Sequence, residues 1–202
     1  MQLELSEKQG ESLVRLARRA IERYLIDGEI TDEKTEDERL MEKSGVFVTL
    51  YKYPEKLLRG CIGFPYPIYP LWEAVKKAAI ASAVEDPRFP PLSLSELPTV
   101  IIEVSVLTVP ERLDAESPEK LLSFIEIGKH GLIVKRGMRS GLLLPQVATE
   151  YGWDEETFLS ETCLKAGLPE DCWRKKGTEV YRFEAEIFEE VRPLGPVKRV
   201  SR

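Results

Sequence analysis

The amino-acid sequence predicts an α+β fold that is built from two successive ββαβ-like units. Two strands, a helix and a third strand follow one another between residues 46 and 109, and a similar order recurs between residues 132 and 191. The last strand alternates apolar and polar residues over Val180–Ile187, which is typical of an antiparallel or mixed sheet with one face in water. The repeated order suggests an internal duplication with helices on one side of each sheet.

The chain opens with a predicted helix over Ser6–Ile26. Ser6 and Gln9 have the spacing of a capping box, in which each side chain bonds the backbone of the other residue. Apolar residues then recur at helical spacing from Leu13 to Leu25 and form one stripe. Residues 27–44 are densely charged, so we expect an exposed connection there.

The first ββαβ unit follows this connection. We expect strands over Val46–Tyr53 and Leu57–Phe64, joined by a short turn. Pro70 begins a helix that runs to Val84, and Asp86-Pro87 ends it. Thr99–Val109 is the third strand. The apolar face of this sheet needs a cover, and the Pro70–Val84 helix provides one.

The second unit is predicted by the same signals. Its expected elements are a short helix over Pro118–Ile125, a hairpin of Leu132–Arg136 and Gly141–Leu144, helices over Gln146–Tyr151 and Glu155–Ala166, and a final strand over Glu179–Val191. This division gives one subdomain of residues 1–26 with 45–125, and another of residues 126–195.

Composition excludes several classes of protein. The longest apolar runs are far shorter than the roughly 20 residues that span a bilayer, and no signal peptide is visible at the N-terminus, so we expect a cytoplasmic protein. The net charge of −6 makes duplex nucleic acid an unlikely ligand. The absence of asparagine, together with abundant charged residues, indicates a thermophilic source of archaeal type.

The chain has 3 cysteines, which are Cys61, Cys163 and Cys172. An odd number without metal-binding spacing favours free thiols in a reducing cytoplasm over a disulfide framework. Cys163 falls on the apolar face of a predicted helix, so we expect it in the core. With a single histidine and no C-x-x-C motif, the sequence predicts no metal site.

The segment Leu57–Phe64 holds the first candidate for chemistry. Alternation along a strand places Arg59, Cys61 and Gly63 on one face, and a guanidinium beside a thiol favours the reactive thiolate. A glycine in a strand also marks a bulge or a close approach by a ligand or another backbone. The structural alternative is a core cysteine beside glycines that let a helix pack closely on the sheet.

His130 is the only histidine and lies between glycines at the start of a strand. A cysteine nucleophile needs a base, so a Cys61–His130 dyad is the natural hypothesis. The alternative is an ordinary surface or hydrogen-bonded histidine. The common nucleotide and hydrolase motifs are absent, and the sequence identifies no cofactor.

Four further polar residues stand where structure alone does not require them. Asp86 and Arg88 lie in a proline-bounded loop, which either ends the helix or clamps an anionic ligand. Glu103 lies in the middle of an apolar strand and is either paired, solvated or at a cleft. Gln146 follows Pro145 at a helix start, where free N–H groups can bind an anion.

Six motifs in order resemble the AMMECR-type domain family and cover about residues 10–193. They are Leu58-Arg59-Gly60-Cys61-Ile62-Gly63, Asp86-Pro87-Arg88-Phe89, Ile102–Leu107, Gly128-Lys129-His130-Gly131-Leu132, Leu144–Ala148 and Cys163–Leu168. The resemblance implies one cytoplasmic α+β domain of two unequal subdomains with a cleft between them. It implies no established activity, and it associates the family with Memo-type and radical-SAM proteins in a modification pathway that acts on a small molecule or a nucleic-acid base.

Two functions follow from these residues. In the first, the protein is an enzyme of unknown substrate with Cys61 as nucleophile, His130 as acid or base, and Arg59 lowering the thiol pKa or binding an anion. The other cleft residues would bind the ligand: Asp86, Arg88, Glu103 and Gln146. In the second, the same motifs hold the fold of a non-catalytic binding or scaffold module that recognises a partner protein. The acidity and accessibility of Cys61 distinguish the two.

Overall fold

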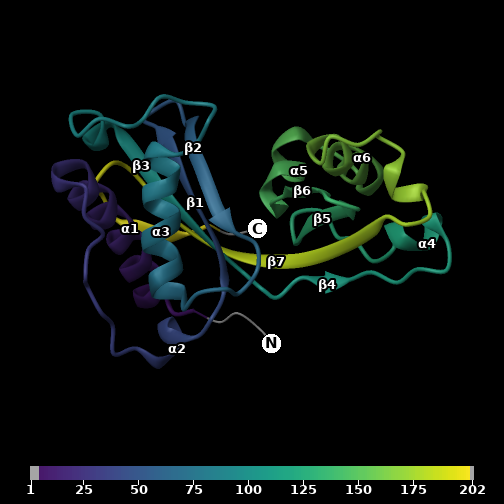
Figure 1. Ribbon diagram of the computed structural model, residues 1–202, viewed down its shortest axis with the longest axis horizontal. Coiled ribbons are helices and arrows are strands. Elements are labelled where there is room, and N and C mark those ends of the chain that lie inside the picture. The colour runs from purple at the N-terminus through teal and green to yellow at the C-terminus, as the bar shows by residue number, and fades with distance from the viewer. Residues whose placement is uncertain (1–4, 201–202) are drawn as a thin grey trace. The chain divides into compact units, whose positions relative to one another are not determined.

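A computed structural model describes residues 5–200, and the contacts divide them into two units. Unit 1 contains the described residues up to Val109 and those from Glu186 onward, whereas unit 2 contains Pro110–Ala185. The long strand β7 (Glu179–Glu190) passes from unit 2 into unit 1 (Figure 1). Residues 186–195 fall in unit 1 and not with residues 126–185 as the sequence predicts, because β7 is continuous in the sequence although its two ends belong to different units. Residues 110–125 fall in unit 2, where Glu111 and Arg112 pair with β7.

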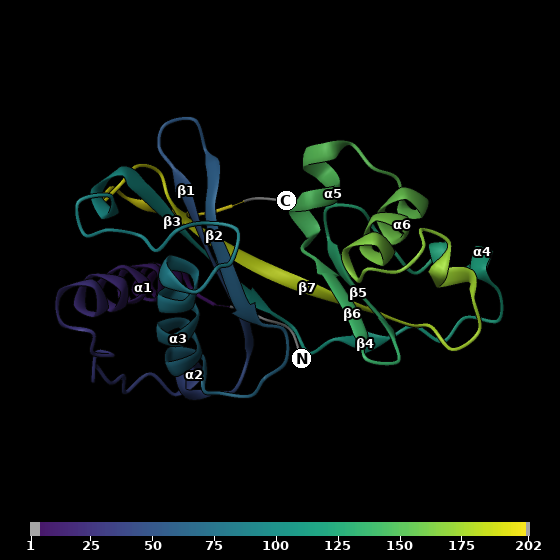
Figure 2. The ribbon, with the colours of Figure 1, turned by 45° about the horizontal axis from the view of Figure 1, so that its top comes forward.

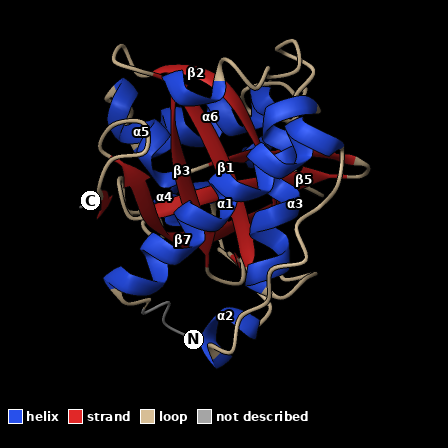
Figure 3. Ribbon diagram, turned by 90° about the vertical axis from the view of Figure 1, so that its left-hand side faces the viewer, coloured by secondary structure: helices blue, strands red, loops and turns tan. Residues whose placement is uncertain are grey.

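Unit 1 is a sheet with two long helices on one face (Figures 1 and 3). Its elements are α1 (Glu7–Asp27), α2 (Glu38–Met41), β1 (Gly45–Lys52), β2 (Leu57–Phe64), α3 (Leu71–Val84), the 3-10 turn η1 (Leu97–Thr99), β3 (Val100–Leu107), the end of β7 and β8 (Val197–Arg199). The strand order is β2-β1-β3-β7, and β1 pairs antiparallel with both β2 and β3. The predicted sheet and its covering helix are thus confirmed.

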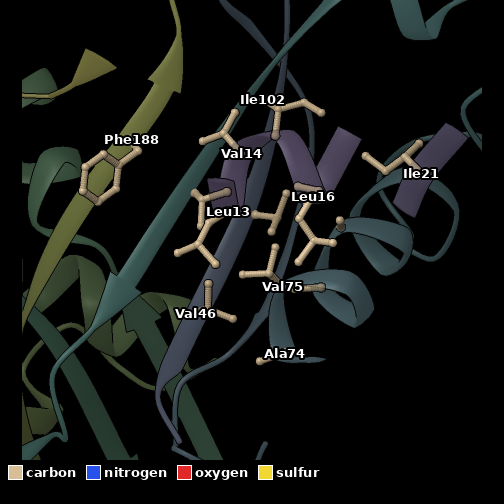
Figure 4. Close-up of a cluster of buried hydrophobic side chains, with 14 of the residues drawn as sticks. Leu13, Val14, Leu16, Ile21, Val46, Ala74, Val75, Ile102 and Phe188 are labelled. Atoms are coloured by element: carbon tan, nitrogen blue, oxygen red, sulfur yellow. The ribbon is translucent and has the colours of Figure 1, made fainter. Parts of the chain in front are cut away.

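Helix α1 forms where its sequence signals place it. Ser6 Oγ accepts a hydrogen bond from Gln9 N, and Gln9 Oε1 accepts one from Ser6 N, which completes the predicted capping box. Gly28 ends the helix at a φ of 76°, a conformation that glycine adopts without strain. The apolar stripe of α1 packs on α3 and the sheet, and Figure 4 shows Leu13 and Leu16 in this core.

One charged residue interrupts the apolar stripe of α1. Arg18 is buried and donates through Nε to Glu190 Oε1 at 2.8 Å, and its Nη2 bonds the other carboxylate oxygen. Its two terminal nitrogens also donate to Leu97 O at 3.0 Å and Val100 O at 2.7 Å. The side chain of Glu190 is fully buried in β7. The pair therefore ties α1 to η1, β3 and β7 inside unit 1.

Unit 2 repeats the arrangement with other lengths. Its elements are β4 (Glu111–Arg112), α4 (Pro118–Leu122), β5 (His130–Arg136), β6 (Arg139–Leu143), α5 (Pro145–Tyr151), α6 (Glu155–Lys165), the 3-10 turn η2 (Cys172–Arg174) and the first part of β7. The strand order β6-β5-β7 matches β2-β1-β3 of unit 1, and α5 and α6 pack on the hairpin (Figure 2). The predicted α+β class with two ββαβ-like units is confirmed.

Unit 2 contains a disulfide, although the number and spacing of the cysteines predict free thiols. Cys163 and Cys172 are bonded with their Cα atoms 5.9 Å apart, and both are fully buried. The prediction of free thiols was wrong, because the chain turns back after α6 at Gly167, where φ is 68°. Compartment arguments against disulfides also fail for proteins of hyperthermophiles. Cys61 is the free cysteine.

In the described part of the chain, no helix combines the length and apolar character that crossing a membrane requires.

Candidate functional site

Three side chains from neighbouring strands of unit 1 form what we call the Cys61 row. Thr49 of β1 lies opposite Cys61 of β2 on one side and opposite Glu103 of β3 on the other. Cross-strand partners point to the same face, and their neighbours Ile102 and Val104 face the core under α1 and α3, so the row lies on the face opposite these two helices. Thr49 Oγ1 donates to Cys61 Sγ at 3.3 Å. Thr49 and Glu103 are buried, and Cys61 is half-buried.

The loop after α3 attaches to the outer edge of β2 beside the row. Asp86 Oδ2 accepts from Cys61 N at 2.9 Å, and Arg88 Nη2 lies 3.4 Å from Cys61 O. Arg88 also holds Asp86 through two parallel bonds of 2.9 and 2.6 Å. The backbone N–H and C=O of Cys61, which lie on the open edge of the sheet, thus both bind side chains. These contacts prevent another strand from pairing with β2 at this point. The hydrogen bonds from Arg88, with those from the backbone of Cys61, lower the pKa of Asp86 to about 2.

Arg59 is not among the groups that shift the pKa of Cys61, contrary to the prediction from its position in the strand. The pairing between β1 and β2 shifts at this point, with Leu50 opposite Gly60 and Tyr51 opposite Leu58, so Arg59 is the extra residue of a bulge. Its buried guanidinium donates to Glu96 Oε1 at 2.7 Å, and Nη2 donates to Pro90 O at 2.9 Å. The role of Arg59 is therefore to hold the 90–96 loop against β2.

The pKa of Cys61 moves in the opposite direction from the one expected. Burial is the largest cause and raises it, and the carboxylates of Glu103 and Asp86 raise it further. The hydrogen bond from Thr49 and the charge of Arg88 lower it without reversing the result. The prediction of a thiolate stabilised by Arg59 was therefore wrong, and the thiol of Cys61 is protonated near neutral pH.

Gly60 of β2 has the structural role that we gave as the alternative, which is to let a helix pack closely on the sheet. A Cβ on Gly60 would lie 2.1 Å from Ser82 O, so only glycine lets α3 approach β2 this closely. Ser82 Oγ then reaches the strands, accepting from Ile62 N at 2.8 Å and lying 2.7 Å from Val48 O. Close helix packing, not an open patch, explains this glycine.

The two remaining candidates, His130 and Gln146, lie in unit 2. His130 Nδ1 accepts from Glu126 N at 3.0 Å, which places the ring proton of the neutral form on Nε2. Burial and the charges of Arg182 and Lys129 lower the pKa of His130. The structure thus brings Cys61, Glu103, Asp86 and Arg88 together within unit 1, whereas the Cys61–His130 dyad and the cleft between the units stay predictions.

Two residues of the site were missed, Thr49 and Glu96. Counting hairpin pairs back from the turn would have placed Thr49 opposite Gly60, because the bulge at Arg59 shifts the register by one residue, so no local signal identified Thr49 as the partner of Cys61. Nothing local marks Glu96 as the partner of Arg59 across 37 residues. Among the described residues no group of histidine, cysteine and carboxylate side chains is arranged to hold a metal ion.

Comparison with known proteins identifies the family. The AMMECR1 family model matches residues 14–188, a span that includes the whole Cys61 row. The chain belongs to the AMMECR1 family. It is 59% identical to Protein PH0010 of Pyrococcus horikoshii over 98% of both chains, and 58% identical to Protein MK0488 of Methanopyrus kandleri over 96% of this chain and 94% of that one.

A crystal structure of PH0010 from Pyrococcus horikoshii has the same fold as this AMMECR1-family chain. The TM-score is 0.94 at 57% identity, over 99% of this chain and 100% of that one. The names of these archaeal relatives state no activity, substrate or partner. The resemblance seen in the six sequence motifs is thereby confirmed, and function has to be argued from the site.

Proposed function

We propose that this AMMECR1-family protein is a cytoplasmic, non-catalytic binding module that recognises a partner protein, and that its contact surface is the accessible part of the site, formed by half-buried Cys61 and the exposed side chain of Arg88 beside it. One observation carries the proposal. Arg59 and Arg88 are each paired with a carboxylate that holds the fold, and the thiol of Cys61 beside them is protonated near neutral pH.

Nucleophilic catalysis by cysteine needs a thiolate, which a positive neighbour or a base must supply. Arg59 is paired with Glu96, and Arg88 is paired in bidentate fashion with Asp86, so neither guanidinium supplies an unbalanced positive charge. The other ionisable groups that act on the thiol are the carboxylates of Glu103 and Asp86, which oppose its ionisation. This environment favours a thiol that makes contacts over one that attacks a substrate.

A second candidate is the enzyme, which one observation favours. Cys61 is free and half-exposed, and Glu103 lies in the same row. A buried carboxylate can serve as a general base once a ligand excludes water. This reading requires that Cys61 reacts readily in the folded protein.

Alkylation of Cys61 separates the two. The rate of reaction with iodoacetamide would be measured from pH 6 to 11 by mass spectrometry of the Cys61 peptide, with the uncharged N-acetylcysteine amide as reference in the same buffers. We expect a midpoint above that of the reference, and a further rise in Thr49→Val, because the hydrogen bond from Thr49 favours the thiolate. Cys61→Ser provides the blank. A midpoint below that of the reference, with faster reaction at pH 7, would overturn the binding-module proposal in favour of the enzyme.

A further inference from the structure

A second surface of unit 1 already holds an extended acidic segment. Residues 29–37, which we call the strap, connect α1 to α2 and contain no helix or strand. Alternate residues of the strap face the protein: Thr31, Glu33, Thr35 and Asp37 are half-buried, whereas Asp32, Lys34 and Glu36 are exposed. This period of two is that of an extended chain lying on a surface.

The surface binds the two inward carboxylates of the strap. Arg19 of α1 forms a fork on Glu33, with Nε 2.9 Å from Oε1 and Nη2 2.8 Å from Oε2. Hydrogen bonds from Arg19 lower the pKa of Glu33, so this carboxylate is charged at neutral pH. Nε2 of Gln9 lies 3.2 and 3.0 Å from the two carboxylate oxygens of Asp37. The surface therefore binds two acidic side chains that are four residues apart.

The same surface binds the backbone of the strap. Nε1 of Trp72 donates to Glu33 O at 2.9 Å, and Nζ of Lys76 lies 3.2 Å from Thr31 O and 3.1 Å from Glu33 O. Lys76 is only 3% exposed in α3, and its ammonium also pairs with Glu73 Oε1 at 2.7 Å, so the carbonyls of the strap and this carboxylate together offset its lost hydration. Contacts to main-chain carbonyls do not depend on the sequence of the bound segment, so another extended chain could make them.

The strap buries little of its large apolar side chain and leaves a cavity beside it. Ile30, its one large apolar residue, is 50% exposed. A cavity of about 210 Å³ lies beside the strap, lined by residues of α1, α2, α3 and the strap itself: Ser6, Lys8, Gln9, Ser12, Thr35, Asp37, Leu40 and Trp72. The ion pair between Arg19 and Glu33 lies at partly exposed positions, so it contributes little to stability and weakens with salt. Trp72 and Lys76 would keep carbonyl acceptors if another extended segment replaced the strap.

We propose that this surface of α1 and α3 is a docking site for an extended acidic segment of a partner protein, and that the chain occupies it with its own strap when no partner is bound. The occupant in place shows the chemistry that the surface selects, namely carboxylates at positions i and i+4 and exposed main-chain carbonyls. A tethered segment has an effective concentration near the millimolar range, so it acts as a competitor that a partner must displace. The proposal concerns a surface separate from the Cys61 row and does not rest on the function proposed for that row.

The test uses the full chain and a fluorescein-labelled peptide of residues 29–37 with blocked ends, followed by fluorescence anisotropy. In the variant Glu33→Gln/Asp37→Asn the strap loses its two inward carboxylates, and asparagine still caps α2. The matched control is Asp32→Asn/Glu36→Gln, which removes the same charge from the exposed side. We expect the peptide to bind the first variant about tenfold more tightly than the wild type or the control, a difference that corresponds to about 1.4 kcal/mol.

Four further measurements decide the interpretation. A peptide with Gln and Asn at the Glu33 and Asp37 positions should not show the tenfold tighter binding to the first variant, because it lacks the two carboxylates. For the same reason, 0.5 M NaCl should weaken the binding of the original peptide. Equal binding by the two double variants would overturn the proposal. A nine-nucleotide oligo(dT) that competes as strongly as unlabelled peptide would overturn the proposal in favour of a general polyanion site. In sedimentation, concentration-dependent dimerisation of the Glu33→Gln/Asp37→Asn variant would overturn it in favour of a second copy of the chain as the occupant.

Discussion

Replacing Arg18 by methionine tests the account of the unit 1 core most directly. The change removes the bidentate partner of Glu190 and the donors to Leu97 O and Val100 O. Glu190 would keep Ile102 N at 3.2 Å and Arg15 at 3.5 Å, and it would remain a fully buried carboxylate. Breaking a buried ion pair on one side costs about 3–5 kcal/mol, so we expect a loss of that size in the free energy of unfolding of unit 1.

Native-state hydrogen exchange of the β3 amides, measured by mass spectrometry, reports on unit 1 without assuming that both units unfold together. The control is Arg19→Met, one residue along the same helix, whose pair with Glu33 is 46% and 36% exposed and should contribute less than about 1 kcal/mol. Because the cost comes mostly from the stranded carboxylate, Arg18→Met/Glu190→Leu should be more stable than Arg18→Met alone. A loss below about 1 kcal/mol in Arg18→Met, or a double variant less stable than the single one, would refute the reasoning.

Three other predictions follow from the structure. Gly60→Ala places a Cβ 2.1 Å from Ser82 O, so it should cost about 1–3 kcal/mol in chemical denaturation, and a neutral effect would contradict the close contact of α3 and β2. The pKa of Asp86 is about 2, against the usual 3.8, so the charged carboxylate stabilises the fold above pH 4 by roughly 2 kcal/mol, and this stabilisation is lost as the pH falls towards 2. Asp86→Asn should flatten that part of the curve of unfolding free energy against pH. An unchanged slope would contradict the pairing of Asp86 with Arg88. The Cys163–Cys172 disulfide closes a short loop at a sequence separation of 9. Its reduction should lower the opening free energy of the β5 amides, measured by hydrogen exchange, by about 3 kcal/mol and leave that of the β3 amides unchanged. Equal effects in both units would contradict a local cross-link.

Local signals in the sequence were sufficient for the elements and their order. The capping box at Ser6 and the glycine after Asp27 mark the two ends of α1, and the predicted range of β2 agrees with the observed one. The grouping of Cys61, Glu103 and Arg88 was also predictable, because each is a polar or reactive side chain where core packing alone would select an apolar one. These inferences depend on neighbouring residues and on side-chain period, which the sequence displays directly.

The errors arose where distant residues or an extra residue decide the outcome. Alternation assigned Arg59 to the face of Cys61, but a bulge adds one residue to β2 and removes the strict period of two. The partner of Arg18 lies 172 residues away, and the partner of Arg59 lies 37 residues away, so no local pattern could identify either. The direction of the Cys61 pKa depends on burial and on carboxylates from two other segments, which become neighbours only in the folded chain.

The position of Glu190 near the end of the chain has a consequence for biosynthesis. Arg18 leaves the ribosome early, and its partner follows 172 residues later, which takes about 10–30 s at typical rates of translation. All residues of unit 2 are synthesised before Glu186, the first residue of the segment that completes the sheet of unit 1. The unit that contains the N-terminal helix is therefore the last that can finish folding, and a nascent chain that stalls before β7 would present α1 with an uncompensated charge on its apolar face.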